Sequence, residues 1–193
     1  GRFPVQWVIR PQSDQYHDFR GYAGLVSGGI FRKGEDVVVL PSGFTTKIKS
    51  IETMDGELKE AFPPMSVTMT LEDDIDISRG DMLAKVNNQP TKAQEIELMV
   101  CWLNVDPLKL GGKYTVKHTT NEARAIIKEV KYKVNVNTLE KNEEDKAVRA
   151  NDIARITIKT AKPLLFDSYR KNRNTGSLII IDEFSQQTVG AGM

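Results

Sequence analysis

The chain has 193 residues, of which 27 are Lys or Arg and 26 are Asp or Glu, so its formal charge is +1. This balance excludes an overall positive potential that would attract nucleic acid or an anionic membrane. The single cysteine, Cys101, excludes an intrachain disulfide and any multi-cysteine metal site, and it favours a reducing compartment, so we expect a cytoplasmic protein. No apolar run reaches the roughly 20 residues that a membrane-spanning helix needs, and the length suits one large all-β domain or two small domains.

Short runs of alternating apolar and polar residues fill the first half of the chain, which is the period of β-strands. Val5, Trp7 and Ile9 alternate in the first run, and Gly28-Gly29 suits a bulge or bend. Turns rich in Gly and Pro separate these runs, and their spacing favours a closed barrel. Four further strands are expected. One is Val37–Leu40, and the next contains Ile48, which points inward between outward Lys47 and Lys49. In the third, Val67, Met69 and Leu71 point inward and Thr68 and Thr70 outward, and the fourth lies in Ser78–Val86.

The polar segment Asn87–Gln94, which carries Pro90, is the expected linker between domains. We therefore predict a first domain over residues 1–88 and a second over residues 89–193.

The second half of the chain shows the same strand period. Gly111-Gly112 marks a turn before a strand, and the end of the chain predicts a two-strand hairpin that turns near Asp182–Gln187. The residues expected to face inward are Ile96, Leu98, Val100 and Trp102 in one strand, and Ala154, Ile156 and Ile158 in another.

The segment Glu122–Glu140 is ambiguous. Ile126, Val130 and Val134 fit the period of a helix, whereas Val130, Tyr132, Val134 and Val136 fit that of a strand. We favour a strand from Tyr132 onward because β-branched and aromatic residues dominate there. The fold predicted from these patterns is all-β, with two antiparallel β-barrels in tandem.

The stretch Leu110–Thr115 invites comparison with a nucleotide phosphate loop. That loop needs a glycine separated by four residues from the Gly-Lys pair, and Ser or Thr directly after the lysine. Pro107 and Tyr114 stand at these two positions, so we expect a turn that opens a strand.

Asp74, Asp76 and Ser78 have the spacing of the first ligands in a calcium loop. The glycine is displaced to Gly80, however, and Lys85 occupies the position of the bidentate glutamate. A solvated acidic loop that keeps a sheet edge soluble is therefore the favoured interpretation.

The two histidines and the cysteine suggest no active site. His17 and His118 have no spacing that indicates metal binding or acid–base catalysis, so we expect both at the surface. Cys101 is expected as a buried, inert thiol on the strand face opposite Trp102. We therefore predict no catalytic, cofactor-binding or metal-binding residue in this chain.

The densest positive charge lies in Ser168–Asn174, which contains Arg170, Lys171 and Arg173. These side chains are either solvated cations or a contact for an anionic partner, such as an acidic protein patch, RNA or a nucleotide phosphate. Three charges alone would bind nucleic acid weakly and with strong salt dependence. We retain Arg170, Lys171 and Arg173 as candidates for a partner contact.

Three stretches resemble translational GTPases of the elongation factor Tu type. Phe19–Gly43 resembles the opening of their second domain, in which an Arg-x-Gly-acid turn leads into a buried strand. Ile77–Ala84 is similar to the end of that domain, and Thr188–Met193 to the end of the third. The resemblance implies domains two and three of this superfamily.

Within that superfamily, the chain most resembles the large subunit of bacterial sulfate adenylyltransferase. The resemblance extends over essentially the whole chain. It rests on Arg2–Val8, Asp18–Gly24, Val37–Gly43, Asp55–Leu58 with Ala61-Phe62, Thr70–Leu83 and Asn172–Asp182.

This resemblance implies a heterodimer. Its small catalytic subunit makes adenylyl sulfate and pyrophosphate from ATP and sulfate, and its large subunit hydrolyses GTP to drive that step. GTP and Mg would be held by an N-terminal GTPase domain that is absent from this chain, and ATP by the partner subunit. The expected partners are therefore the small subunit and the chain's own GTPase domain, without nucleic acid or membrane.

Two alternatives belong to other classes of protein. The barrels could hold aminoacyl-tRNA, as in a translation elongation factor, although the near-neutral charge argues against it. A purely structural adaptor, coupled to no nucleotide enzyme, is the third hypothesis.

Overall fold

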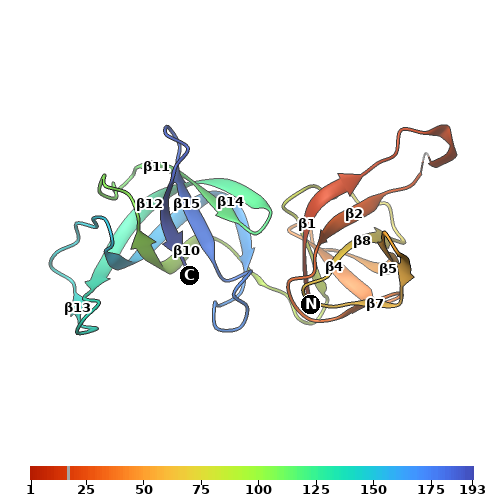
Figure 1. Ribbon diagram of the computed structural model, residues 1–193, viewed down its shortest axis with the longest axis horizontal. Coiled ribbons are helices and arrows are strands. Elements are labelled where there is room, and N and C mark those ends of the chain that lie inside the picture. Colours follow the sequence, from red (N-terminus) through yellow and green to blue (C-terminus); the bar gives the residue numbers. More distant parts are fainter. Residues whose placement is uncertain (17) are drawn as a thin grey trace. The chain divides into compact units, whose positions relative to one another are not determined.

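The computed structural model describes every residue of the chain except position 17, so the expectation for His17 lies outside the described residues. The chain divides into two compact units, Gly1–Pro90 and Thr91–Met193 (Figure 1). We call them the first and the second barrel. No helix within the described residues is long and apolar enough to cross a membrane.

Six antiparallel strands close the first barrel. Their order is β4-β9-β1-β2-β8-β5, and β5 pairs again with β4. Outside the ring, β6 pairs with β5, β3 pairs with β7, and a 3-10 turn, η1, follows β1. The elements are β1 (Arg2–Ile9), η1 (Asp14–Tyr16), β2 (Gly21–Leu25), β3 (Phe31–Arg32), β4 (Asp36–Leu40), β5 (Phe44–Thr53), β6 (Gly56–Leu58), β7 (Glu60–Ala61), β8 (Ser66–Leu71) and β9 (Met82–Lys85).

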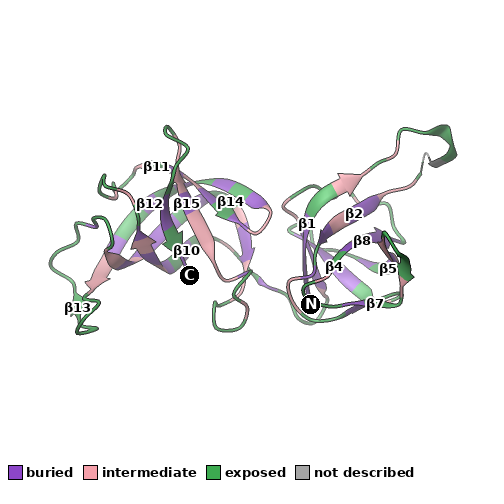
Figure 2. Cartoon of the chain, viewed as in Figure 1, coloured by how far each residue is buried: buried purple, intermediate pink, exposed green. Residues whose placement is uncertain are grey.

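The core of the first barrel follows the predicted alternation in most strands (Figure 2). Ile48 is fully buried while its neighbours Lys47 and Lys49 are exposed, as expected of a strand with one wet face. Phe3 and Phe31 pack edge to face, with ring centroids 6.3 Å apart.

Two expectations for the first barrel are wrong. Trp7 is 64% exposed because a register shift between Val5 and Trp7 turns the next side chains over, so that Val8 packs against the core. Thr70, expected to point outward, is 7% exposed, and its hydroxyl lies 2.5 Å from the Ser50 hydroxyl on the neighbouring strand. A buried hydroxyl with a hydrogen-bond partner carries little penalty.

A second ring of six antiparallel strands forms the other unit. Their order is β11-β15-β16-β10-β14-β12, and β12 pairs again with β11. Both rings together confirm the predicted all-β architecture. The strands are β10 (Thr91–Trp102), β11 (Lys113–His118), β12 (Asn121–Val134), β13 (Lys141–Asn142), β14 (Ile153–Phe166), β15 (Leu178–Asp182) and β16 (Thr188–Gly192).

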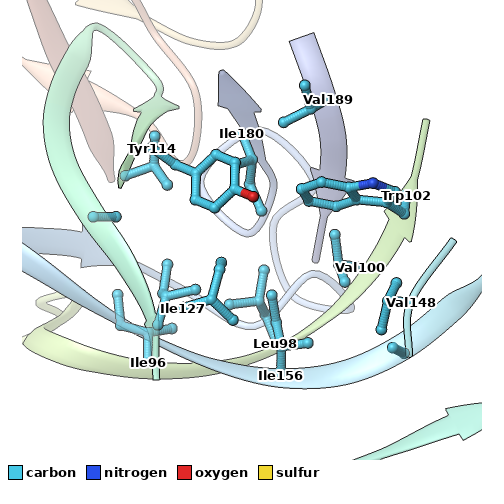
Figure 3. Close-up of a cluster of buried hydrophobic side chains, with 14 of the residues drawn as sticks. Ile96, Leu98, Val100, Trp102, Tyr114, Ile127, Val148, Ile156, Ile180 and Val189 are labelled. Atoms are coloured by element: carbon cyan, nitrogen blue, oxygen red, sulfur yellow. The ribbon is translucent and has the colours of Figure 1, made fainter. Parts of the chain in front are cut away.

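The core of the second barrel forms around Trp102 and Tyr114, whose rings meet edge to face at 5.7 Å (Figure 3). Trp102 also donates from Nε1 to the Asp106 carbonyl at 2.8 Å, so its one polar atom is satisfied. The predicted inward residues of β10 and β14 are all buried, which confirms both alternations.

The ambiguous segment is a strand, and the helical alternative is wrong. β12 begins at Asn121, earlier than predicted, and ends at Val134, which leaves Val136 58% exposed beyond it. Ile126, which the helical period places on the inner face, is 41% exposed. Register shifts between Ile127 and Glu129 and between Val130 and Tyr132 break the alternation that a longer strand would otherwise show.

Candidate functional site

The predicted cationic segment lies in the loop of residues 167–177, which joins β14 to β15; we call it the cationic loop. It lies at the opposite end of the second barrel from the β15–β16 turn (Figure 1). Arg170, Lys171 and Arg173 are all exposed. Outside position 17, none of the three forms an ion pair, and the Arg173 guanidinium lies 5.9 Å from the centroid of the Tyr169 ring.

Local hydrogen bonds shape the cationic loop. The Ser168 carbonyl accepts from the amides of Lys171 and Asn172 at 2.9 and 3.0 Å. The Asn172 side-chain oxygen then accepts from the amides of Asn174 and Thr175 at 3.0 and 3.1 Å. Asparagine is suited to such turns because its side chain can replace a backbone acceptor.

Thr175 anchors the loop to the barrel. It is fully buried, its carbonyl accepts from His118 Nε2 at 2.6 Å, and its hydroxyl donates to Asp167 Oδ2 at 2.7 Å. Because a carbonyl can only accept, the proton of the imidazole resides on Nε2. Asp167, at the end of β14, and His118, at the end of β11, thus hold the loop from two sides.

His118 is 2% exposed, so the expectation of a surface histidine is wrong. Burial lowers the pKa of His118, against the raising effects of its bond to Thr175 and of nearby Asp167. A signal for this position existed in the sequence: Tyr114, Val116 and His118 alternate on the inner face of β11. This alternation predicts an inward His118.

Gly176 permits the close return of the loop. A Cβ atom there would lie 2.5 Å from both the amide nitrogen and the Cα of Tyr169, and 2.6 Å from the Asn172 carbonyl oxygen. All three atoms belong to the backbone, so no side-chain rotation could relieve the clash. The loop conformation that presents the cations therefore depends on this glycine.

A groove of about 580 Å³ lies beside the cationic loop and is lined by residues of β10, β14 and β15. Arg155 and Glu97 pair in it at 2.7 Å, and Lys131 also contacts Glu97, at 3.2 Å. Arg170 lies on its edge. The apolar side chains that line the groove are Ile96, Leu98, Met99, Leu164, Phe166, Tyr169, Leu178 and Met193.

Two other motifs singled out in the sequence form a turn and surface ion pairs. Gly111 and Gly112 form the predicted turn before β11, with Gly111 at φ 69°. Asp74 pairs with Arg20, and Asp76 lies 3.7 Å from Arg10. Among the residues that the structure describes, no group of three or more His, Cys, Asp or Glu could hold a metal ion.

Cys101 is partly exposed, so the expectation of a fully buried thiol is wrong. It lies on the face of β10 opposite Trp102, as predicted, but that face borders a second groove of about 570 Å³.

The first barrel carries a larger polar groove, of about 900 Å³. Its cations differ from those of the cationic loop, because two of them have carboxylate partners: Lys33 with Glu57 at 2.5 Å, and Arg20 with Asp74. The third cation of the groove, Lys49, forms no ion pair among the described residues.

A family model described as GTP-eEF1A C-terminal domain-like matches residues 95–193, which is more than half of the chain. The chain belongs to this family. The family match covers the second barrel from the middle of β10 to its end, and so includes the cationic loop and the groove beside it.

Relatives extend the similarity to the first barrel. The chain is 48% identical over 193 residues to the bifunctional enzyme CysN/CysC of Mycobacterium tuberculosis (strain ATCC 25618 / H37Rv), covering 100% of this chain and 31% of that protein. It is 46% identical over 200 residues to sulfate adenylyltransferase subunit 1 of Bacteroides thetaiotaomicron, covering 100% of this chain and 40% of the relative. The chain thus spans well under half the length of these relatives, and they confirm the resemblance noted in the sequence.

The crystal structure of sup35 complexed with GDP has the same fold as the present chain. Its TM-score is 0.85 at 15% identity, covering 99% of this chain and 46% of that one. Identity this low supports the two-barrel fold alone.

Proposed function

We propose that the chain is the two-barrel part of the GTP-hydrolysing subunit of a sulfate adenylyltransferase. In this proposal a small catalytic subunit forms adenylyl sulfate and pyrophosphate from ATP and sulfate, and GTP hydrolysis drives the reaction. The observation that carries the proposal is the identity of 46–48% to such proteins along the whole chain, through both barrels.

The proposed role of the barrels is to dock on the small subunit and to couple GTP hydrolysis to its reaction. GTP and Mg would bind a GTPase domain outside the present sequence, and ATP would bind the small subunit. Two active sites on separate chains influence one another only through a contact whose strength differs between the nucleotide states. We assign that contact in part to the barrels, in a heterodimer that works in the cytoplasm.

Arg170, Lys171 and Arg173 are our candidates for the contact with the small subunit. They are exposed and unpaired by carboxylates within the described residues. Arginine can bind a carboxylate through two parallel hydrogen bonds and is favoured over lysine at desolvated interfaces. Each would contribute about 0–1 kcal/mol at an exposed rim, whereas truncating one that is buried and paired would cost about 2–5 kcal/mol.

The test uses the full-length subunit and its small subunit. We expect a stable complex whose rate of adenylyl sulfate synthesis rises when GTP is added. A rate that GTP does not change, or two subunits that do not associate, would contradict the proposal.

A second measurement concerns the chain alone. We propose that it neither binds nor hydrolyses GTP, since Pro107 and Tyr114 replace the residues that a phosphate loop needs. Calorimetric titration with GTP and magnesium should give no heat of binding, and micromolar affinity would reveal a nucleotide site in the barrels.

A further inference from the structure

We propose that the groove beside the cationic loop binds an acidic segment of the partner subunit, which inserts an apolar side chain and pairs a carboxylate with Arg170. This inference rests on the proposed function for the identity of the partner. The chemistry of the segment follows from the groove itself.

The floor of the groove is apolar and accessible. Phe166 and Leu178 are half-buried and pack against the core beneath, while Met99 points outward from β10 and is also half-buried. Methionine is flexible and adapts to the shape of an inserted side chain. A volume of about 580 Å³ lies within the range of sites that enclose ligand groups.

The uncompensated charge at the groove is positive. Inside it, Glu97 is neutralised by Arg155 and Lys131, and Asp167 accepts the hydroxyl of Thr175. Arg170, on the edge, has no carboxylate partner in the described part of the chain. A ligand that complements this edge therefore carries carboxylates, which arginine binds in a fork geometry.

The cationic loop, which carries Arg170, is held in place before any ligand binds. His118 and Asp167 fix Thr175 from two strands, and Gly176 lets the loop return within contact of Tyr169. A loop that is already ordered loses less conformational entropy on binding, so more of the contact energy appears as affinity.

The apolar floor continues past the loop, which favours an extended segment over a compact small molecule. The second groove, of about 570 Å³, shares Met99, Leu178 and Met193 with the first. It adds Lys117, an exposed cation without an ion-pair partner among the described residues. Each of the two grooves thus has an exposed cation in its lining, Arg170 in one and Lys117 in the other.

A protein segment fits these features better than RNA. Nucleic acid is bound mainly through many phosphate contacts, and its specific recognition relies on aromatic platforms for bases. The cationic loop offers few cations, and its exposed aromatic ring, Tyr169, already contacts the guanidinium of Arg173. Apolar floor and scattered cations instead match an acidic segment with an apolar anchor.

The test measures the affinity of the full-length subunit for the small subunit at fixed salt. Arg170→Glu and Met99→Glu should each weaken binding at least about 10-fold, and Arg170→Lys should weaken it less. The matched control is Lys146→Glu, at an exposed lysine that lines neither groove. Arg170 is exposed, so its variants should retain the thermal unfolding of the parent even if Met99→Glu does not fold.

A second arm defines the ligand with labelled probes and fluorescence anisotropy. A short peptide with Leu and Phe flanked by Asp and Glu should bind, the same peptide flanked by Lys should not, and Arg170→Glu should abolish the signal. Subunit affinity unchanged in both groove variants would overturn the inference and leave the proposed function intact. If the parent subunits do not associate, the proposed function fails, and the peptide arm alone decides the inference. Binding of polyuridine instead of the acidic peptide would overturn the assignment to protein.

Discussion

The two barrels close in the same way and differ in the charges they leave unpaired. In the polar groove of the first barrel, Lys33 and Arg20 have carboxylate partners, and Lys49 has none within the described residues. In the cationic loop of the second barrel, Arg170 and Lys171 have none within the described residues. Closure dictates which side chains point inward, so the difference between two similar rings lies in their outer surfaces. Function is therefore to be sought in those unpaired charges.

The barrels also differ in strand length. The longest strand of the first barrel, β5, has 10 residues, whereas β12 and β14 of the second have 14 each. Register shifts let the long strands coil around the ring without losing their pairing. The cationic loop begins where β14 ends, so the longer strands place it beyond the ring.

The largest effect should come from truncating the two cores. Ile156 in the second barrel and Ile48 in the first are both fully buried. Ile156→Ala should destabilise the second barrel by about 2–5 kcal/mol, because the lost contacts leave a cavity, and Ile48→Ala should do the same to the first.

Hydrogen-exchange mass spectrometry locates each loss. Protection should fall in the strands of the mutated barrel and remain in the other. Equal loss of protection in both barrels would mean that they unfold as one unit, and this would contradict the description of two separate cores.

Replacing one glycine by alanine in each barrel should lower stability for two different reasons. Gly176→Ala forces a Cβ against backbone atoms of the cationic loop and should cost about 1–3 kcal/mol. Gly34→Ala, in the first barrel, meets no atom within 4 Å but keeps φ at 82°, so only backbone strain of about 1–2 kcal/mol is expected. Urea unfolding gives both values. Only Gly176→Ala should also weaken binding of the small subunit; a similar loss in Gly34→Ala would argue against a specific role for the loop.

A half-buried ion pair in the first barrel should matter more than an exposed one. Glu35 and Lys85 have side chains 26% and 21% exposed, whereas those of Asp36 and Lys47 are 66% and 47% exposed. Lys85→Met should cost about 1–2 kcal/mol, and Lys47→Met about 0–1 kcal/mol. Thermal unfolding at neutral pH measures both, and equal losses would contradict this ranking.

The half-buried pair also predicts an acid dependence. Burial raises the pKa of Glu35, but hydrogen bonds from Lys85 and from the Arg32 amide outweigh it, so the pKa is lowered overall. The stability that this pair supplies is present above the ordinary pKa of glutamate and is lost as the pH falls through the lowered value. In Lys85→Met, the free energy of unfolding should therefore depend less on pH in that acidic range.

The smallest effect should be a pH dependence of the second barrel through His118. Burial lowers its pKa, so the unfolded chain takes up a proton at a higher pH than the folded one. Stability should be fully present above the ordinary pKa of histidine and decline below it, by at most about 1.4 kcal/mol per pH unit. Urea midpoints at mildly acidic and neutral pH should differ more in the parent than in His118→Gln. An unchanged difference would exclude His118 as the cause.

Alternation in the sequence predicted both barrels and their inward faces, because a strand with one buried side has a strict period of two. It failed where that period is interrupted. Trp7 and Val8 exchange faces at a register shift, and β12 contains two such shifts, which made Ile126 and Val130 resemble a helical pair. Bulges depend on cross-strand partners that are distant in the sequence, so no local pattern reveals them.

The candidate site was predictable in part. Charge density alone located Arg170, Lys171 and Arg173, which the structure brings into one exposed loop. The anchor of that loop was missed, because His118 and Thr175 are 57 positions apart and meet only when β11 and β14 enter the same ring. The groove was missed for the same reason, since its walls come from several strands and a loop.

The central claim is that the small subunit docks on the second barrel through unpaired cations. The direct test compares two double variants of the full-length subunit, Arg170→Ala with Arg173→Ala in the second barrel, and Lys33→Ala with Lys49→Ala in the first. Affinity for the small subunit is measured by calorimetry, alongside GTP-stimulated adenylyl sulfate synthesis. We expect the second-barrel variant to lose at least about 10-fold in affinity and most of the GTP stimulation, while the first-barrel variant matches the parent. Parent-like affinity and stimulation in the second-barrel variant, with its fold intact, would contradict the claim and leave the cationic loop as solvated charge.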